Sequence, residues 1–153
     1  MLLPLDTDRS TAFIGAPALW SQLGGQGKAG RGVIVGIVDS GIWPESPSVQ
    51  DDGGLPAPPA KWTGTACEFG SAKPGDLPYV CDHKLIGARR MMTTFDTFGP
   101  APGAGEYFTA RDNNGHGSHT ATTAAGNANV AAEFNGTPLG ILSGVAPRAH
   151  LAV

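Results

Sequence analysis

The sequence predicts an α/β domain built around a mostly parallel sheet. A nearly continuous run of β-branched residues lies between Gly32 and Ile42 and is typical of a strand covered on both faces in a parallel sheet. Two segments, near 16–23 and 116–126, have the pattern of short helices. A chain of 153 residues is long enough for one domain with a real core and too short to predict two, so we treat 1–153 as one unit.

The amino-acid composition limits which binding partners are expected. A net charge of −3 with 15% charged residues provides no basic patch, so neither nucleic acid nor an anionic membrane surface is expected as a partner. No apolar run approaches the ~20 residues that a membrane span needs. The opening Met1–Leu5 lacks the basic start and apolar core of a secretory signal, so any targeting segment is expected outside this sequence.

The first elements follow from local pattern. Residues 1–16 show no sustained periodicity and are predicted to form an extended arm. The next segment, 16–23, is predicted to be a short amphipathic helix, with Pro17 near its start and two glycines directly after it. The strand that comes next ends at Asp39, where open α/β sheets place functional groups. Asp39 is therefore a candidate active-site residue; the alternative is an Asp that caps the following turn.

A long irregular segment is predicted from 43 to 82, because its seven prolines suit neither a helix nor an inner strand. It contains both cysteines of the chain, Cys67 and Cys81. Their spacing suits a disulfide that closes a loop of about 15 residues. Two reduced thiols in a cytosolic protein are the alternative, whereas a metal site lacks the further ligands that it needs.

The second chemical feature is a helix that we expect to begin near His116. The preceding residues 84–92 form a possible strand, and 93–109 read as a loop. Asn113 and Asn114 suit a helix entry, and Gly126 suits its end. An imidazole in the first turn feels the positive end of the helix dipole, which keeps it available as a general base.

These two motifs resemble those of a known family. The sequences of Val38–Ile42 and Asn113–His119 are similar to the Asp and His motifs of the subtilisin-like serine proteases, whose triad runs Asp, His, Ser along the chain. Further segments resemble the cucumisin-like branch, familiar from plants and also found in bacteria: 41–46, 61–65, 84–89 and 120–127. The resemblance implies a three-layer α/β fold with a mostly parallel sheet.

By the same resemblance, Asp39 matches the triad aspartate and His116 the triad base. His119 matches a position that is not catalytic in the family, and Ser118 stands where the family usually has Thr. No Gly-Thr-Ser nucleophile motif occurs in the chain, so the serine and the oxyanion-hole asparagine are expected downstream of Val153. The chain is thus interpreted as the N-terminal part of a truncated peptidase domain that is inactive by itself.

The function predicted is that of a secreted, disulfide-bonded serine endopeptidase of the S8 class that hydrolyses proteins or peptides. The resemblance also implies a zymogen with an inhibitory propeptide. No cofactor is expected, and calcium sites cannot be assigned without the spacing of a known loop. Two alternatives stay open: a catalytically inactive binding module of the same fold, and a metal site of Asp112, His116 and His119, which lack the HExxH pattern.

Overall fold

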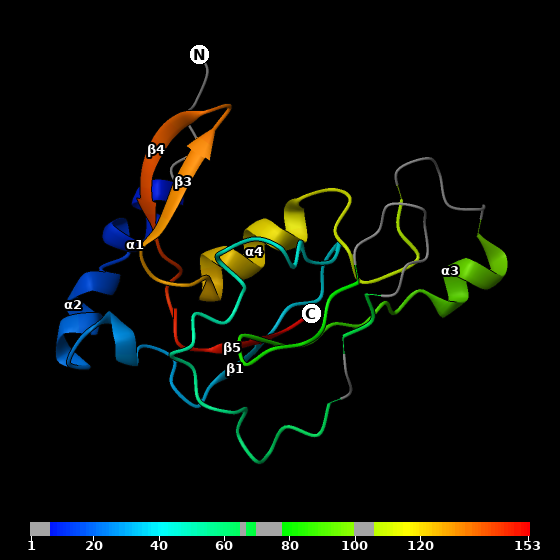
Figure 1. Ribbon diagram of the computed structural model, residues 1–153, viewed down its shortest axis with the longest axis horizontal. Coiled ribbons are helices and arrows are strands. Elements are labelled where there is room, and N and C mark those ends of the chain that lie inside the picture. Colours follow the sequence, from blue (N-terminus) through cyan, green and yellow to red (C-terminus); the bar gives the residue numbers. More distant parts are fainter. Residues whose placement is uncertain (1–6, 65–66, 70–77, 100–105) are drawn as a thin grey trace.

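The computed structural model describes residues 7–64, 67–69, 78–99 and 106–153. Three short strands, β1 (Ile34–Gly36), β2 (Leu85–Gly87) and β5 (His150–Ala152), form a sheet in the order β1-β5-β2 (Figure 1). Both strand pairs are parallel, so the predicted α/β class with a parallel sheet is confirmed. The predicted strand near residues 84–92 is β2, and the chain's last strand is central and buried.

The strand β1 departs from its prediction in one respect. We expected it to be covered on both faces, but Ile34 and Val35 are only partly buried and Val38 is fully exposed. The reason is its position, because β1 lies at the edge of the described sheet and pairs on one side only, with β5. A run of β-branched residues predicts the strand but does not show how many neighbours it has.

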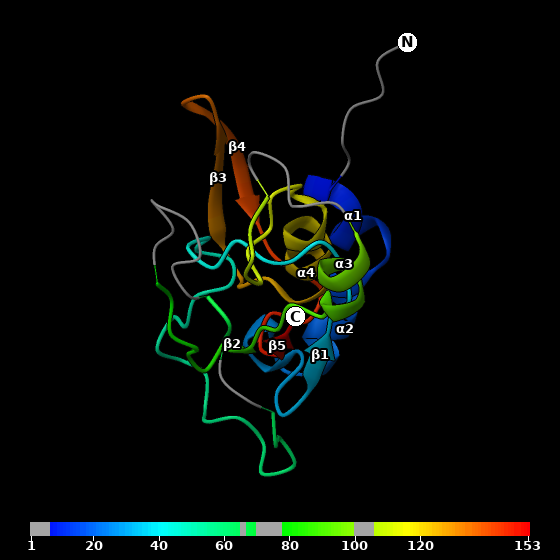
Figure 2. The same ribbon diagram turned by 90° about the vertical axis from the view of Figure 1, so that its right-hand side faces the viewer.

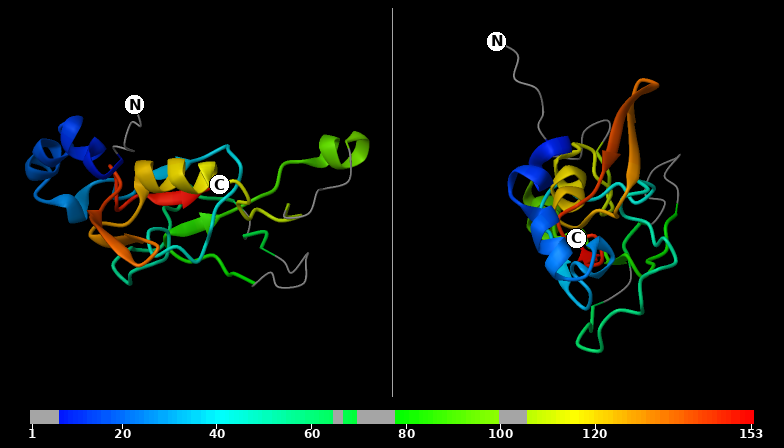
Figure 3. Two further views of the ribbon diagram at one scale, coloured as in Figure 1. Left: turned by 90° about the horizontal axis from the view of Figure 1, so that it is seen from above. Right: turned by 90° about the vertical axis from the view of Figure 1, so that its left-hand side faces the viewer.

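The helix α4 (His116–Ala125) begins at the predicted residue and lies over β5 (Figure 3). Its inward face is made of small side chains, and Ala121 and Ala125 are fully buried. Small residues let a helix approach a sheet closely, which keeps the first turn of α4 near the ends of the strands. Within the part of the chain that is described, none of the helices combines the length and apolar character that crossing a membrane requires.

The helix α2 (Ala16–Gln22) matches the predicted one and is followed by a short 3₁₀ turn, η1 (Gln26–Lys28). Trp20 fastens α2 to the rest of the domain, since its Nε1 donates a hydrogen bond of 2.9 Å to the Val145 carbonyl. The hydrophobic core lies between these elements and the sheet, with the following buried members: Ile42, Val49, Phe69, Leu85, Ala88, Ala110, Ala121, Ala125, Ala149 and Leu151.

Two predictions of irregular structure are wrong. The arm expected over residues 1–16 contains α1 (Thr7–Phe13), which packs beside α2 although its sequence has little periodicity. The loop expected over 93–109 contains α3 (Thr93–Phe98), an exposed helix stabilised by an ion pair between Asp96 and Arg90. Both helices depend on a partner outside their own sequence window, which a local pattern does not reveal.

A β-hairpin that we did not predict stands off the sheet (Figure 2) and lies near α1 (Figure 1). It consists of β3 (Val130–Phe134) and β4 (Thr137–Leu142), which pair antiparallel. Asn135 and Gly136 connect the strands, and both have positive φ angles, of 49° and 76°. An Asn-Gly pair between two strands is a strong signal for a two-residue hairpin turn, so the hairpin could have been predicted from the sequence.

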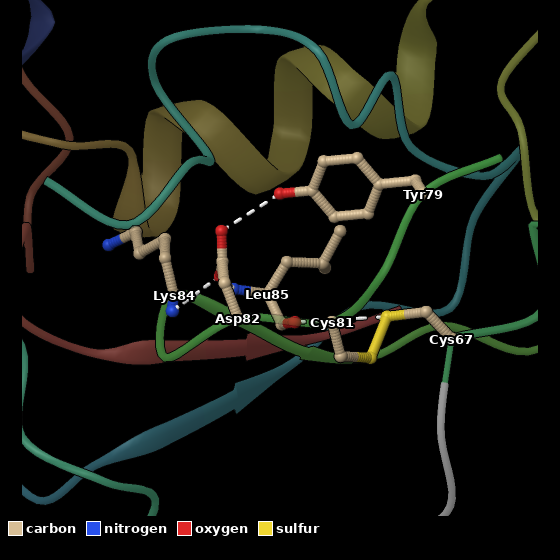
Figure 4. Close-up of a disulfide and its surroundings, with 6 residues drawn as sticks. All are labelled: Cys67, Tyr79, Cys81, Asp82, Lys84 and Leu85. Atoms are coloured by element: carbon tan, nitrogen blue, oxygen red, sulfur yellow. Dashed lines mark hydrogen bonds between the residues drawn. A yellow bond between two sulfur atoms is a disulfide. The ribbon is translucent and has the colours of Figure 1, made fainter. Parts of the chain in front are cut away.

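The long segment from 43 to 82 has no helix or strand among its described residues, as predicted. A disulfide joins Cys67 to Cys81 within it, with a Cα–Cα distance of 5.4 Å (Figure 4). Beside the disulfide, Asp82 accepts hydrogen bonds of 2.7 Å from the backbone N–H groups of Lys84 and Leu85. The disulfide thus holds two parts of the irregular segment together, and the hydrogen bonds of Asp82 connect its end to the start of β2.

Removing this bridge should cost stability. In the chain-entropy model a closed loop of this size stabilises the fold by about 3 kcal/mol, so we expect the double variant Cys67→Ser, Cys81→Ser to lose about that much free energy of unfolding. Urea unfolding of the variant and of the wild type, with and without reductant, measures the loss. A change below about 1 kcal/mol would show that the bridge contributes little to the fold.

Candidate active site

Asp39 and His116 come together although 77 residues separate them. Asp39 follows the carboxyl end of β1, and His116 is the first residue of α4. The His116 Nδ1 lies 2.8 Å from Asp39 Oδ1 and 2.9 Å from Oδ2, within the hydrogen-bond range expected for such a pair. The imidazole side chain is 67% exposed and the Asp39 side chain 18%, so the outer part of the ring is accessible.

Two further groups hold the Asp39 carboxylate. The Ser40 N–H donates a hydrogen bond of 2.7 Å to Oδ1, and Thr120 Oγ1 lies 3.1 Å from Oδ2. The hydrogen bond from His116 and then that from Ser40 lower the pKa of Asp39 below its ordinary value. Asp39 is therefore ionised at neutral pH and accepts a hydrogen bond from Nδ1–H, which leaves Nε2 as the basic nitrogen of the ring.

Sequence reasoning missed Thr120 as a neighbour of Asp39, although its position was informative. It lies four residues after His116, which places both on one face of a helix.

Sequence reasoning also treated Asp112 only as a possible metal ligand. In the structure Asp112 is 5% exposed and accepts hydrogen bonds from every side.

The donors to Asp112 come from the loop after β1 and from the start of α4. Its Oδ1 accepts a hydrogen bond of 3.0 Å from the Ser40 hydroxyl. The same oxygen accepts hydrogen bonds from the backbone N–H groups of Asn114, at 2.9 Å, and Gly115, at 2.8 Å. Its Oδ2 accepts from the Ser118 N–H at 2.8 Å and from the Ser118 hydroxyl at 2.7 Å. Asp112 thus contacts both of the elements that carry the Asp39–His116 pair.

These hydrogen bonds keep Asp112 charged. Burial alone raises the pKa of a carboxyl group, but the hydrogen bonds from Ser118, Gly115 and Asn114 outweigh it and lower the pKa of Asp112 to about 2. The hypothesis of a metal site had grouped Asp112 with His116 and His119. Among the described residues no three His, Cys, Asp or Glu side chains are grouped so that they could hold a metal ion.

Two glycines let the loop after β1 touch the first turn of α4. Gly41 has a φ of +118°, a conformation that other residues rarely adopt. A Cβ atom on Gly117 would lie 2.2 Å from the Gly41 carbonyl oxygen, which is too close for any side chain. Gly41, two residues after Asp39, and Gly117, directly after His116, therefore set how closely the two motifs approach.

A second contact fixes the register of the loop. Ile42 forms an isolated parallel bridge with Arg111, the residue before Asp112. Arg111 is buried, and its guanidinium donates hydrogen bonds of 2.9 and 2.6 Å to Glu45 and lies over the Trp43 ring. This cluster holds the segments on either side of the site together. Sequence reasoning missed it, because its partners are 66 residues apart.

A cavity of about 800 Å³ opens beside Asp39 at the carboxyl ends of the three parallel strands. Gly36, Gly87 and Ala152 line it where β1, β2 and β5 end, and its other walls include Met91 and Tyr107. Ligands of open α/β sheets bind at this end of the strands. The location therefore agrees with that of a functional site.

A parallel α/β sheet whose edge strand presents an Asp to a His at the start of a helix defines a protein of the subtilisin-like class. Residues 30–153 match the Subtilase family, Peptidase_S8, over most of the chain, and the protein belongs to this family. The resemblance drawn from the Asp and His motifs is thereby confirmed.

Curated relatives from Arabidopsis thaliana give the same result. The chain is 38% identical to Subtilisin-like protease SBT1.2 over 99% of its own length and 20% of the relative. It is 47% identical to Subtilisin-like protease SBT4.3 over 78% of its own length and 14% of that relative. For Subtilisin-like protease SBT1.7 the identity is 39%, over 97% and 19% of the two chains. The chain thus spans about a fifth or less of the length of these relatives.

Proposed function

We propose that this chain supplies the Asp and the His of an Asp-His-Ser triad in a serine endopeptidase. The observation that carries the proposal is the hydrogen bond from His116 Nδ1 to the ionised Asp39 carboxylate. Asp39 orients the ring and fixes the proton on Nδ1, so that Nε2 accepts a proton from a serine hydroxyl. Asp39 also stabilises the imidazolium that this transfer forms.

The reaction is acyl transfer. The serine oxygen bonds to the carbonyl carbon of the scissile peptide as its proton moves to His116 Nε2, and the same proton then goes to the leaving amine as the C–N bond breaks. Water repeats the sequence on the acyl-enzyme and releases the acid. The chain contains no Gly-Thr-Ser motif, and its relatives are about five times as long, so we assign the serine and an oxyanion-hole asparagine to sequence outside these 153 residues.

In this proposal residues 1–153 form the N-terminal part of the peptidase domain, and the substrates are proteins or peptides. The disulfide between Cys67 and Cys81 supports a secreted protein, because such bonds persist in oxidising compartments. An inhibitory propeptide and activation as a zymogen belong to the same proposal. The proposed reaction uses no cofactor.

Covalent labelling tests the proposal. A fluorophosphonate probe reacts with a serine only when a neighbouring base activates it, so the full-length protein that contains this chain should be labelled at one serine once its inhibitory propeptide has been removed. Replacing His116 with Ala should abolish the labelling. A folded protein that stays unlabelled after its propeptide has been removed would instead favour a catalytically inactive binding module.

A further inference from the structure

The structure contains two hydroxyl groups that connect Asp112 to the elements on either side of the Asp39–His116 pair. Ser40, from the loop after β1, donates a hydrogen bond from its hydroxyl to Asp112 and accepts one of 2.9 Å from the Gly117 N–H of α4. Ser118, from α4, donates a hydrogen bond from its hydroxyl to Asp112 and accepts one of 2.9 Å from the Trp43 N–H of the loop. The loop and α4 each provide one serine hydroxyl that donates a hydrogen bond to Asp112. Each also provides one backbone N–H that donates a hydrogen bond to the serine hydroxyl of the other element.

We infer that Asp112 is a positioning residue that fixes Asp39 and His116 relative to one another through these two serines. The inference rests on the proposed function, for which this geometry is needed. Ser40 is the neighbour of Asp39 in sequence, and Gly117 is the neighbour of His116, so the hydrogen bond between them joins the two backbones directly beside the pair. Asp112 does not itself contact the His116 ring.

A carboxylate is the group that this arrangement requires. A serine hydroxyl has one proton, and it accepts a backbone N–H in good geometry only if that proton points elsewhere. An ionised carboxylate accepts hydrogen bonds and donates none, so it directs both serine protons toward itself. An asparagine side chain would offer an N–H₂ group to at least one of the five donors that now reach Asp112.

Three backbone N–H groups also donate hydrogen bonds to Asp112. Asp112 accepts the N–H groups of Asn114 and Gly115 just before α4, and the Ser118 N–H in its first turn. These groups have no partner within the helix, so Asp112 fixes where α4 begins. Since His116 is the first residue of α4, the position of its ring follows from the same contacts. A displacement of about 1 Å at a reacting group costs up to about 100-fold in rate.

The test compares Asp112→Asn with a matched control. Asp82 is the control, because it too accepts hydrogen bonds from the backbone, at Lys84, Leu85 and Asp51, and from a side-chain hydroxyl, at Tyr79, and lies away from the pair. In the full-length protein we expect Asp112→Asn to lower kcat by about 10- to 100-fold with KM changed less than about 3-fold. The control Asp82→Asn should keep kcat within about 2-fold while it lowers the unfolding temperature.

A second measurement does not depend on peptidase activity. The pKa of Asp39 lies below its ordinary value because His116 and Ser40 donate hydrogen bonds to it. Carboxyl ¹³C NMR titration of the full-length protein should show a higher pKa of Asp39 in Asp112→Asn than in the wild type, and an unchanged one in Asp82→Asn. If the wild-type protein has no activity after its propeptide has been removed, the proposed function fails, and this titration still decides the role of Asp112.

Substitutions at Ser118 keep the test decisive if Asp112→Asn does not fold. Ser118→Ala removes one of the two hydroxyls and should lower kcat and raise the pKa of Asp39, whereas Ser118→Thr keeps a hydroxyl and should restore both. Folded variants of Asp112 or Ser118 with unchanged kcat and unchanged Asp39 titration would overturn the inference. An equal loss of kcat in Asp82→Asn would also overturn it, because the effect would then reflect stability alone.

Discussion

Replacing His116 with alanine in the full-length protein is expected to lower kcat by about 10⁶-fold, because the group that accepts and returns the serine proton is lost. KM should change little, since the imidazole acts on the reacting atoms and contributes little to substrate binding. The measurement is steady-state hydrolysis of an unfolded protein or a peptide, with refolding and circular dichroism to show that the variant is folded.

Replacing Asp39 with asparagine should have a smaller effect, about 10⁴-fold in kcat, because the base is still present but its ring loses the acceptor that fixes the Nδ1–H proton. His119 provides the matched control, since it lies on the same helix three residues away and is exposed. The variant His119→Ala should keep kcat within a few-fold. A full-length protein whose activity does not depend on His116 would refute the assignment of the triad.

The two members of the pair could be predicted from sequence because each lies at a locally coded position. A run of β-branched residues ends at Asp39, and residues suited to a helix entry precede His116. The family resemblance then placed them in one site. Their contact in the structure follows from the parallel pairing of β1 with β5, which brings the end of the strand under the start of α4.

The residues around the pair could not be found in the same way. Asp112 is one of several Asp residues in turns, and its role depends on Ser40, which is 72 residues away in the sequence. The ion pair of Arg111 with Glu45 is equally remote. By contrast, Thr120 and the Asn135-Gly136 turn carried local signals, at helical spacing from His116 and between two strands, that a stricter sequence reading would have used.

The exposure of β1 and of its surroundings bears on what this chain does by itself. Val38, next to Asp39, is fully exposed, and Val33 is 46% exposed at the start of the strand. The outer edge of β1 carries backbone groups that pair with no described strand. Exposed apolar side chains beside an open strand edge favour association. We therefore expect the purified 153-residue chain to self-associate as its concentration rises.

The same chain is expected to have no peptidase activity, even though it contains the base and the carboxylate that orients it. Without a serine no acyl-enzyme forms, and without an oxyanion-hole donor the transition state loses about 3–4 kcal/mol of stabilisation. Water attack assisted by His116 alone should therefore be too slow to detect. The chain and the full-length protein are assayed at equal concentration on one unfolded protein substrate, beside His116→Ala in both. Turnover by the chain that disappears in its His116→Ala variant would show that these 153 residues hold a complete catalytic site, and that the serine assigned to sequence outside them is not needed.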